Sequence, residues 1–142
     1  MSRNDIGPRN TGYARGIITL QCHSRLEKSI NNGGCSMPVW KLADTVLHHM
    51  LQALDHLATK GIVHRDMKPA NILYITGKDG KYHFQLGDFG FCNQAIMAQS
   101  QVGTPIYMAP EMFKEGEQTH KLDIWSLYVT ILWTLDIGGF RE

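Results

Sequence analysis

Apolar side chains recur at helical spacing through the middle of the chain. The positions that share this spacing are Ala43, Val46, Leu47, Met50, Leu54 and Leu57. Ser36 and Pro38 come just before them, and both residue types favour the start of a helix, whereas Gly61 favours its end. The pattern therefore predicts one long amphipathic helix that begins close to Pro38 and stops before Gly61.

Shorter runs rich in β-branched and aromatic residues lie on either side of this helix. Ile72–Thr76 and Tyr82–Leu86 are separated by a Gly-Lys-Asp-Gly segment at residues 77–80, which predicts a β-hairpin. Before the long helix, residues 16–21 are typical of a short strand and residues 25–30 of a short helix. The chain is therefore expected to combine helices with a small amount of β-structure.

Residues 122–137 form an apolar segment with hydrophobic side chains nearly all round. The segment is interrupted by Asp123 and is too short to span a bilayer comfortably, so it predicts a buried helix inside a larger domain. The sequence ends five residues after Ile137. We therefore expect that an element that covers this helix is missing.

The segment from residue 88 to residue 111 has no clear hydrophobic periodicity. Its glycines and prolines include Gly90, Gly103, Pro105 and Pro110. These residues predict a long loop, and loops of this length are usually functional or mobile.

Composition narrows the class of protein. The 142 residues are 43% hydrophobic, which favours one globular domain with a buried core. The net charge is +1, from 14 basic and 13 acidic residues, and gives no reason to expect binding to nucleic acid or to a membrane. The three cysteines, Cys22, Cys35 and Cys92, lack CxxC spacing and favour reduced thiols, so the expected location is the cytoplasm or the nucleus.

The first chemical motif is His-Arg-Asp-Met-Lys-Pro-Ala-Asn at residues 64–71. Phosphoryl transfer needs a carboxylate for the proton of the attacking hydroxyl, a cation for the moving phosphate and oxygen ligands for Mg²⁺. Asp66, Lys68 and Asn71 offer one of each within six residues. A lone loop aspartate is often only a turn or cap residue, so the motif needs the support of others.

Three further motifs follow in order. They are Asp88-Phe89-Gly90, directly after the second predicted hairpin strand, then residues 103–111 (GTPIYMAPE) and residues 123–127 (DIWSL). A carboxylate such as that of Asp88 suits Mg²⁺, and Gly90 permits a sharp turn. Together the four motifs resemble those of eukaryotic-type serine/threonine protein kinases, and the resemblance covers residues 16–137.

The resemblance implies roles for the residues of these motifs. Asp66 is similar to the catalytic base, and Lys68 to the lysine that contacts the transferred phosphate. Asn71 and Asp88 resemble the ligands of Mg²⁺. Thr104 resembles the threonine that bonds to the catalytic aspartate and lysine, which favours a serine or threonine substrate.

Other matched positions imply regulation and nucleotide binding. Arg65 resembles the arginine of kinases whose activation loop is switched by phosphorylation. Ser100 lies where the activating phosphosite of the family commonly falls and would be the target of an upstream kinase, although exposed loop serines are also common. Leu73 is expected to form the floor of the adenine site.

A third group of matched positions implies structural roles. His64 and Phe89 resemble two members of the family's regulatory hydrophobic stack. Asp123 resembles the aspartate that anchors the backbone of the catalytic loop. Glu111 resembles a structural glutamate whose arginine partner would lie beyond Glu142.

The fold that the resemblance implies is α+β: the large lobe of a protein kinase, mostly helical with a small β-hairpin at the catalytic loop, truncated after the central buried helix. Residues 1–15 are expected to be a loose N-terminal segment. Residues 16–142 are expected to be a partial catalytic domain, from the hinge region to the central helix. The sequence contains no GxGxxG loop and no VAIK-like lysine strand, so the small lobe is expected to be absent. The last helices of the large lobe, which would follow the central helix, are expected to be absent as well.

Two functions are consistent with this reading. One is a protein serine/threonine kinase that transfers the γ-phosphate of ATP, with Mg²⁺, to hydroxyl groups of protein substrates. The other is a catalytically silent kinase lobe that serves as a binding or scaffold module. The isolated 142-residue chain is expected to be inactive, because half of the groups that position ATP are missing.

Some residues allow a simpler interpretation. Cys92 could be a reactive thiol, but a plain loop cysteine is the simpler prediction. His48 and His49 could suggest a metal site, but exposed helix positions are the simpler prediction. Met50, Trp125 and Trp133 are expected in the core.

Overall fold

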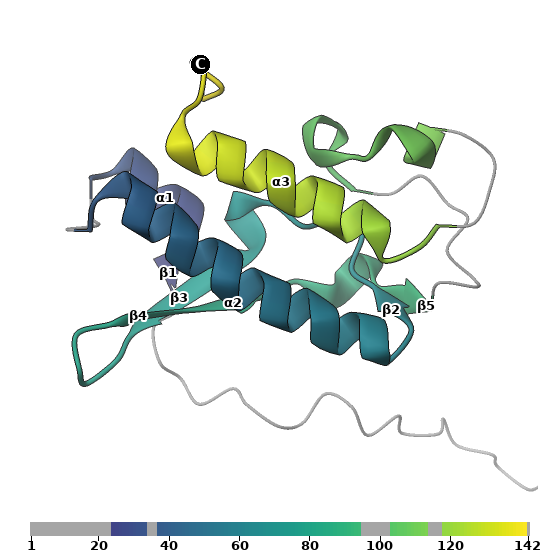
Figure 1. Ribbon diagram of the computed structural model, residues 1–142, viewed down its shortest axis with the longest axis horizontal. Helices are drawn as coiled ribbons and strands as arrows, with labels where there is room; N and C mark the ends of the chain where they lie inside the picture. The colour runs from purple at the N-terminus through teal and green to yellow at the C-terminus, as the bar shows by residue number, and fades with distance from the viewer. Residues whose placement is uncertain (1–23, 34–36, 95–102, 114–117, 142) are drawn as a thin grey trace, which may run out of the picture.

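The computed structural model describes residues 24–33, 37–94, 103–113 and 118–141 (Figure 1). Several sequence predictions lie outside these residues: the loose segment 1–15, the strand at 16–21, the helix-start signal at Ser36, Cys22, Cys35 and the phosphosite at Ser100.

Two long helices form one side of the molecule. Helix α2, Val39–Thr59, and helix α3, Lys121–Leu135, pack against each other, and α2 also contacts strand β4, Tyr82–Leu86. A short helix α1, Leu26–Asn31, lies near the start of α2 (Figure 1). The predicted helices therefore form, with ends within two residues of those predicted from the sequence.

Two small antiparallel sheets complete the fold. The larger one has the order β1-β3-β4, with β1 at Ser24–Arg25 and β3 at Ile72–Thr76. Strands β3 and β4 pair from Ile72 opposite Leu86 to Thr76 opposite Tyr82. The smaller sheet pairs β2, Ile62–Val63, with β5, Asn93–Gln94. The mostly helical α+β fold with a small hairpin is confirmed.

The turn between β3 and β4 has the chemistry that its sequence predicts. Gly77 N–H donates to the carbonyl of Lys81 at 2.7 Å, and Gly80 N–H donates to that of Gly77 at 3.0 Å. Gly80 has φ of +74°, a backbone conformation that glycine adopts without steric cost. The Asp79 carboxylate accepts from Lys81 N–H at 3.1 Å, so local side-chain chemistry also supports the turn.

The ends of α2 also follow from local chemistry. Pro38 directly precedes the helix, and its carbonyl accepts the first helical hydrogen bond, from Leu42 N–H at 2.9 Å. At the other end, Gly61 has φ of +66°, the left-handed conformation that commonly terminates helices. The predicted stop at Gly61 is therefore confirmed.

The hydrophobic core lies between the helices and the larger sheet. Its buried members come from both long helices, α1, the hairpin and the loop before it: Leu26, Leu42, Val46, Met50, Leu54, Met67, Ile72, Phe84, Leu86 and Leu127. Each such aliphatic side chain contributes about 1.5–3 kcal/mol when fully buried. Leu47 and Leu57, which share the predicted spacing, are partly buried at the margin of this core.

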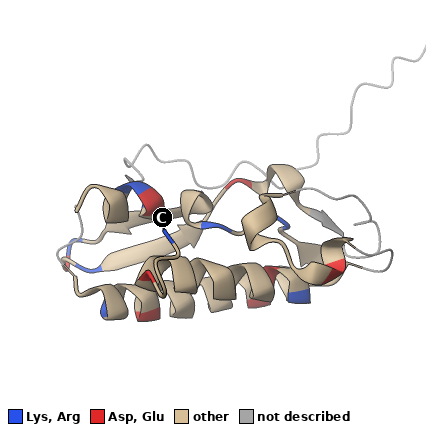
Figure 2. Ribbon diagram, turned by 90° about the horizontal axis from the view of Figure 1, so that it is seen from above, with Lys and Arg blue, Asp and Glu red and all other residues tan. Residues whose placement is uncertain are grey.

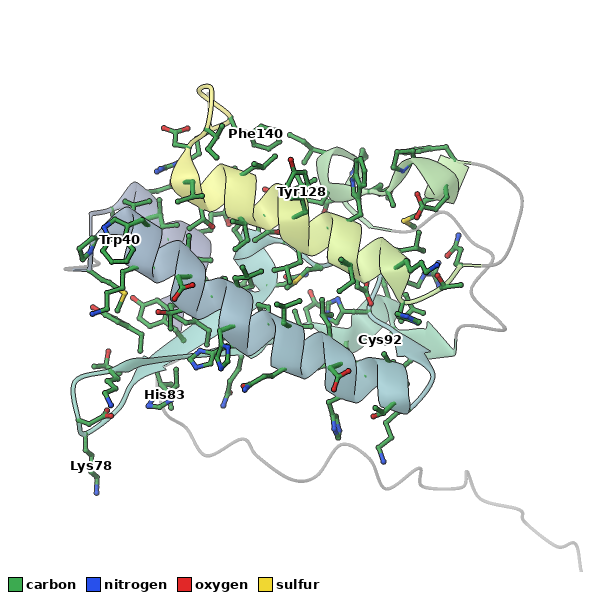
Figure 3. The ribbon with its side chains drawn as sticks, in the orientation of Figure 1. Trp40, Lys78, His83, Cys92, Tyr128 and Phe140 are labelled. Atoms are coloured by element: carbon green, nitrogen blue, oxygen red, sulfur yellow. The ribbon has the colours of Figure 1, made fainter. Side chains whose placement is uncertain are left out.

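Helix α3 is buried on one side only. Trp133 is 9% exposed and lies in the core, as expected, but Trp125 is 41% exposed, so its assignment to the core is wrong. The Trp125 ring lies edge-on to Tyr128, 6.4 Å away, and Tyr128 projects from the side of α3 opposite α2 (Figure 3). Because neighbouring elements pack against only one face of this apolar helix, the apolar side chains on its other face are exposed to solvent.

Within the segment 88–111, the described residues form more local structure than a long loop. Short 3₁₀ turns form at Phe89–Phe91 (η2), Pro105–Tyr107 (η4) and, just past it, Pro110–Phe113 (η5). A similar turn, η1 at Pro69–Asn71, precedes β3. Single turns of this kind carry no hydrophobic period, so periodicity could not reveal them.

The distribution of charged residues agrees with the small net charge of the chain. Figure 2 shows basic and acidic positions interspersed along the described chain rather than separated by sign. No helix within the described ranges has the length and hydropathy that crossing a membrane requires.

Replacing Thr130 with valine is expected to raise the free energy of unfolding by about 1 kcal/mol. Thr130 in α3 is fully buried, and its hydroxyl has no hydrogen-bond partner within the described part of the chain. Valine keeps the branched shape and removes the unsatisfied group. Urea denaturation of the chain measures the change.

Thr134→Val is the matched control. The hydroxyl of Thr134 is also buried in α3 but donates to the carbonyl of Thr130 at 2.8 Å, so its removal should not stabilise the fold. A loss of stability in Thr130→Val, equal to that in Thr134→Val, would contradict the expectation.

Candidate active site

The loop that carries the first motif is fastened to helix α3 by a buried carboxylate. Asp123 Oδ2 accepts from His64 N–H and Oδ1 from Arg65 N–H, both at 2.8 Å. Arg65 has φ of +73°, unusual for a residue with a side chain, so the loop needs such support. Burial raises the pKa of Asp123, while the two N–H groups and the first turn of α3 favour its charged form.

Asp66 lies at the centre of a polar cluster. Its side chain is buried, and its Oδ1 accepts from the hydroxyl of Thr104 at 3.0 Å. Its Oδ2 lies 2.9 Å from Lys68 Nζ and accepts from Asn71 Nδ2 at 2.9 Å. Lys68 Nζ also donates to Thr104 Oγ1 at 2.7 Å. Four residues, Asp66, Lys68, Asn71 and Thr104, therefore form one hydrogen-bonded cluster.

The orientation of the Asn71 amide follows from this cluster. Asn71 Nδ2 donates both to the Asp66 carboxylate and to the Asp66 carbonyl, each at 2.9 Å. The two amide hydrogens are thus directed at Asp66. The remaining polar atom, Oδ1, is of the type that binds hard cations.

Asp88 follows strand β4 at the same end of the hairpin as Asn71. Gly87 N–H donates to the carbonyl of Asn71 at 2.8 Å, which joins the two segments directly before Asp88. Asp88 is exposed, has φ of +56° and accepts from Gly90 N–H at 3.4 Å. Leu73 lies beside this junction, since a Cβ on Gly87 would meet Leu73 Cδ1 at 2.9 Å.

Asn71 and Asp88 are the residues that could hold a magnesium ion. The described residues contain no cluster of three or more His, Cys, Asp or Glu suited to a metal ion. Mg²⁺ in phosphoryl-transfer sites is held by one or two protein carboxylates together with substrate phosphates and waters. One carboxylate and one amide oxygen at the same end of the hairpin fit that requirement.

His64 links the catalytic loop to the segment after β4. His64 Nε2 donates to the carbonyl of Gly87 at 3.0 Å, and its Nδ1 accepts from Asp66 N–H at 3.3 Å. These two bonds assign a proton to Nε2 and none to Nδ1. The rings of His64 and Phe89 meet edge to face at 5.2 Å, and Phe89 is otherwise exposed.

Cys92 is a poor candidate for a reactive thiol. Its Sγ donates to the carbonyl of His64 at 3.7 Å (Figure 3 marks its place). Burial, with smaller contributions from Asp123 and Asp88, raises the pKa of the thiol to about 12. Little thiolate would exist at neutral pH, which supports the interpretation as a plain cysteine.

Three residues that position the site were not singled out from the sequence: Gly87, Gly103 and Ser126. Gly103 has φ of +125°, and a Cβ there would lie 2.5 Å from the carbonyl oxygen of Arg65. Ser126 Oγ donates to the carbonyl of Tyr107 at 2.7 Å and so joins α3 to η4. Gly103 and Ser126 lie inside two of the four sequence motifs, and this position is the feature of the sequence that could have indicated a role for them.

Not every predicted site residue joins the cluster. Glu111 is exposed in η5, and no ion pair to it is found among the described residues. Arg65 is buried, and burial lowers the pKa of its guanidinium. The phosphosite that was predicted at Ser100 lies outside the described residues.

Comparison with known proteins gives the same family as the motifs. A family model described as protein kinase domain matches residues 17–136. Serine/threonine-protein kinase TIO of Arabidopsis thaliana is 42% identical over 97 residues, which are 66% of this chain and 7% of that protein. Ribosomal protein S6 kinase 2 alpha of Gallus gallus is 37% identical over 100 residues, 68% of this chain and 13% of that protein.

A third relative is somewhat more similar over a shorter stretch. Serine/threonine-protein kinase ste20 of Aspergillus fumigatus is 45% identical over 86 residues, which are 58% of this chain and 10% of that protein. The matched part of the chain thus spans between 7% and 13% of the length of these relatives. Since the family model covers most of the sequence and the relatives are kinases by name, the chain belongs to the protein kinase domain family.

Proposed function

We propose that the chain supplies the catalytic loop for Mg²⁺-dependent transfer of the γ-phosphate of ATP to serine or threonine hydroxyls of protein substrates. The observation that carries this proposal is the cluster in which Asp66 bonds to Lys68, Asn71 and Thr104. One buried carboxylate beside a cation and a hydroxyl is what orientation and deprotonation of an acceptor alcohol require.

Asp66 is the proposed general base. Its carboxylate is fixed by three side-chain donors, so its oxygens are held in one place while the acceptor hydroxyl approaches. Lys68 is the proposed cation for the transferred phosphoryl group. Its side chain is 24% exposed while that of Asp66 is 3% exposed, so the ammonium lies at the accessible side of the cluster.

Asn71 and Asp88 are the proposed ligands of Mg²⁺. When bound, the ion neutralises phosphate charge and orients the phosphates of ATP. The protein holds these ligands on the two chain segments that the bond from Gly87 to Asn71 connects. Leu73, half-buried beside that connection, is the proposed apolar contact for the adenine ring.

Thr104 supports hydroxyl-bearing protein substrates in this proposal. Its hydroxyl bridges Asp66 and Lys68, and η4 follows it immediately along the chain. A substrate segment that bound against η4 would therefore lie next to the proposed base. The three relatives described above are named as kinases, two of them explicitly as serine/threonine kinases.

A chimaeric kinase domain tests this function. Residues 61–135, which carry all four motifs, would replace the matching residues of the ste20 kinase of Aspergillus fumigatus. The small lobe of that kinase would supply the glycine-rich loop and lysine that the 142-residue sequence does not contain. The chimaera is expected to transfer labelled phosphate to a protein substrate of the parent kinase, and chelation of Mg²⁺ should abolish the transfer.

The 142-residue chain alone is expected to transfer no measurable phosphate, because the groups that position ATP are missing from its sequence. A folded chimaera without activity, beside an active parent kinase, would refute the proposed catalysis. That result would favour the silent binding module instead.

A further inference from the structure

A histidine of helix α2 meets the outer edge of strand β4. The larger sheet has the order β1-β3-β4, so one side of β4 has no neighbouring strand among the described residues. On that side, Phe84 N–H donates to His49 Nδ1 at 3.3 Å. Phe84 is 6% exposed, so its backbone N–H needs a partner other than bulk water. The prediction that His49 is exposed is therefore wrong, because its ring is half-buried against β4.

This hydrogen bond requires one protonation state of the imidazole. Nδ1 can accept from Phe84 N–H only while it carries a lone pair, so the proton of neutral His49 lies on Nε2. Imidazolium carries a hydrogen on both nitrogens. Protonation of His49 would therefore set two N–H donors against each other at the edge of β4.

The surroundings of His49 make that extra charge unfavourable. The ring of His48, from α2, lies 6.0 Å from that of His49, and the ring of His83, from β4, is stacked on it at 6.2 Å (Figure 3 marks His83). Burial lowers the pKa of His49 most, and His48 and His83 lower it further. Burial and both neighbouring imidazoles therefore oppose protonation of His49.

An acidic group beside this cluster, Asp79, contacts side chains other than His49. Asp79, from the β3–β4 turn, lies 3.9 Å from His83 Nε2 and 3.6 Å from Lys81 Nζ. Asp79 thus lies beside Lys81 and His83, and no ion pair between it and His49 is found among the described residues.

We propose that His49 is an acid-released latch, which fastens the β3–β4 hairpin to α2 while neutral and frees the edge of β4 once protonated. The hairpin carries Asn71 directly before β3 and Asp88 shortly after β4. Release would thus loosen both proposed Mg²⁺ ligands. That last consequence rests on the proposed function, whereas the latch rests only on the packing of α2 against β4.

The direction of the pH effect follows from linkage. A base whose pKa is lower in the folded chain binds a proton more readily after unfolding. Stability from the latch is therefore present above the ordinary histidine value of 6.5 and is lost as the pH falls below it, down to the lowered pKa of folded His49. The predicted loss lies in the mildly acidic range.

Amide hydrogen exchange of the 142-residue chain tests the latch. The protection factor of Phe84 N–H is expected to be about tenfold lower near pH 5.5 than near pH 7.5. His49→Asn places an amide oxygen where Nδ1 stood but cannot be protonated, so it should remove this pH dependence. His56→Asn, at an exposed position of the same helix, should leave the dependence as in the unmodified chain.

Unchanged protection of Phe84 across this range, or the same loss in His49→Asn, would overturn the latch. If His49→Asn failed to fold, an NMR titration of the unmodified chain would still test the latch. The NMR titration of the His49 ring and the shift of the Phe84 amide should then share one midpoint, and different midpoints would overturn the proposal. Neither readout depends on kinase activity, so failure of the proposed function would leave this result intact.

Discussion

Replacing Asp123 with alanine is expected to lower the free energy of unfolding by about 3–5 kcal/mol. Asp123 is 2% exposed and accepts from two backbone N–H groups, those of His64 and Arg65. Alanine would leave both donors buried without their acceptor, in a loop whose Arg65 already has an unfavourable φ of +73°. Urea denaturation of the chain measures the loss.

Two companion variants separate the hydrogen bonds from other effects. Asp123→Asn keeps the side-chain volume and one acceptor, so it should cost less than the alanine variant but still about 2 kcal/mol. Asp44→Ala, at an exposed position of α2, should change stability by less than about 0.5 kcal/mol. An Asp123→Ala protein as stable as Asp44→Ala would show that the loop does not depend on this carboxylate.

The elements that the sequence predicted best are those with local causes. The hairpin strands Ile72–Thr76 and Tyr82–Leu86 form with the predicted bounds, because the Gly-Lys-Asp-Gly turn determines their register. Helix α2 ends as Gly61 predicts, since a left-handed residue terminates it by backbone geometry alone. Such signals require no knowledge of distant parts of the chain.

The predictions of side-chain exposure were wrong where contacts with distant parts of the chain determine whether a residue is buried. Trp125 and Trp133 lie on the same apolar helix, yet Trp133 is buried and Trp125 is 41% exposed, because α2 and the core cover only one face of α3. His49 resembles its exposed neighbour His48 in sequence, but the edge of β4 provides it with a backbone donor. Periodicity alone does not reveal which face a neighbour will cover.

In the candidate site, too, the identity of the residues could be predicted from the sequence, whereas their contacts could not. Motif resemblance identified Asp66, Lys68, Asn71 and Thr104, and the structure brings these four side chains into contact. It could not identify the atoms that bond. That the Asn71 amide directs its nitrogen at Asp66 depends on how η1 folds back over the loop. The close approach of Gly103 to the Arg65 carbonyl likewise requires the folded chain.

Asp66→Asn is expected to reduce phosphate transfer by the chimaeric kinase about a thousandfold. The amide cannot accept the proton of the substrate hydroxyl. Its nitrogen would also face at least one of the donors that now bond to the carboxylate, from Lys68, Asn71 or Thr104. The decrease should lie in kcat, with the KM for ATP little changed, because Asp66 is proposed to act on the acceptor hydroxyl.

The control must show that the chimaera has kept its fold, because Asp66 is buried and its replacement disturbs a hydrogen-bonded cluster. Asp79→Asn makes the same chemical change at an exposed position of the β3–β4 turn, inside the exchanged segment, and should leave kcat unchanged. Thermal unfolding of the chimaera and of both variants monitors the fold. A folded Asp66→Asn chimaera that keeps kcat within about tenfold of the unmodified chimaera would remove Asp66 from the role of base. A selective loss of kcat in a folded variant would instead mean that proton transfer at this carboxylate limits the reaction.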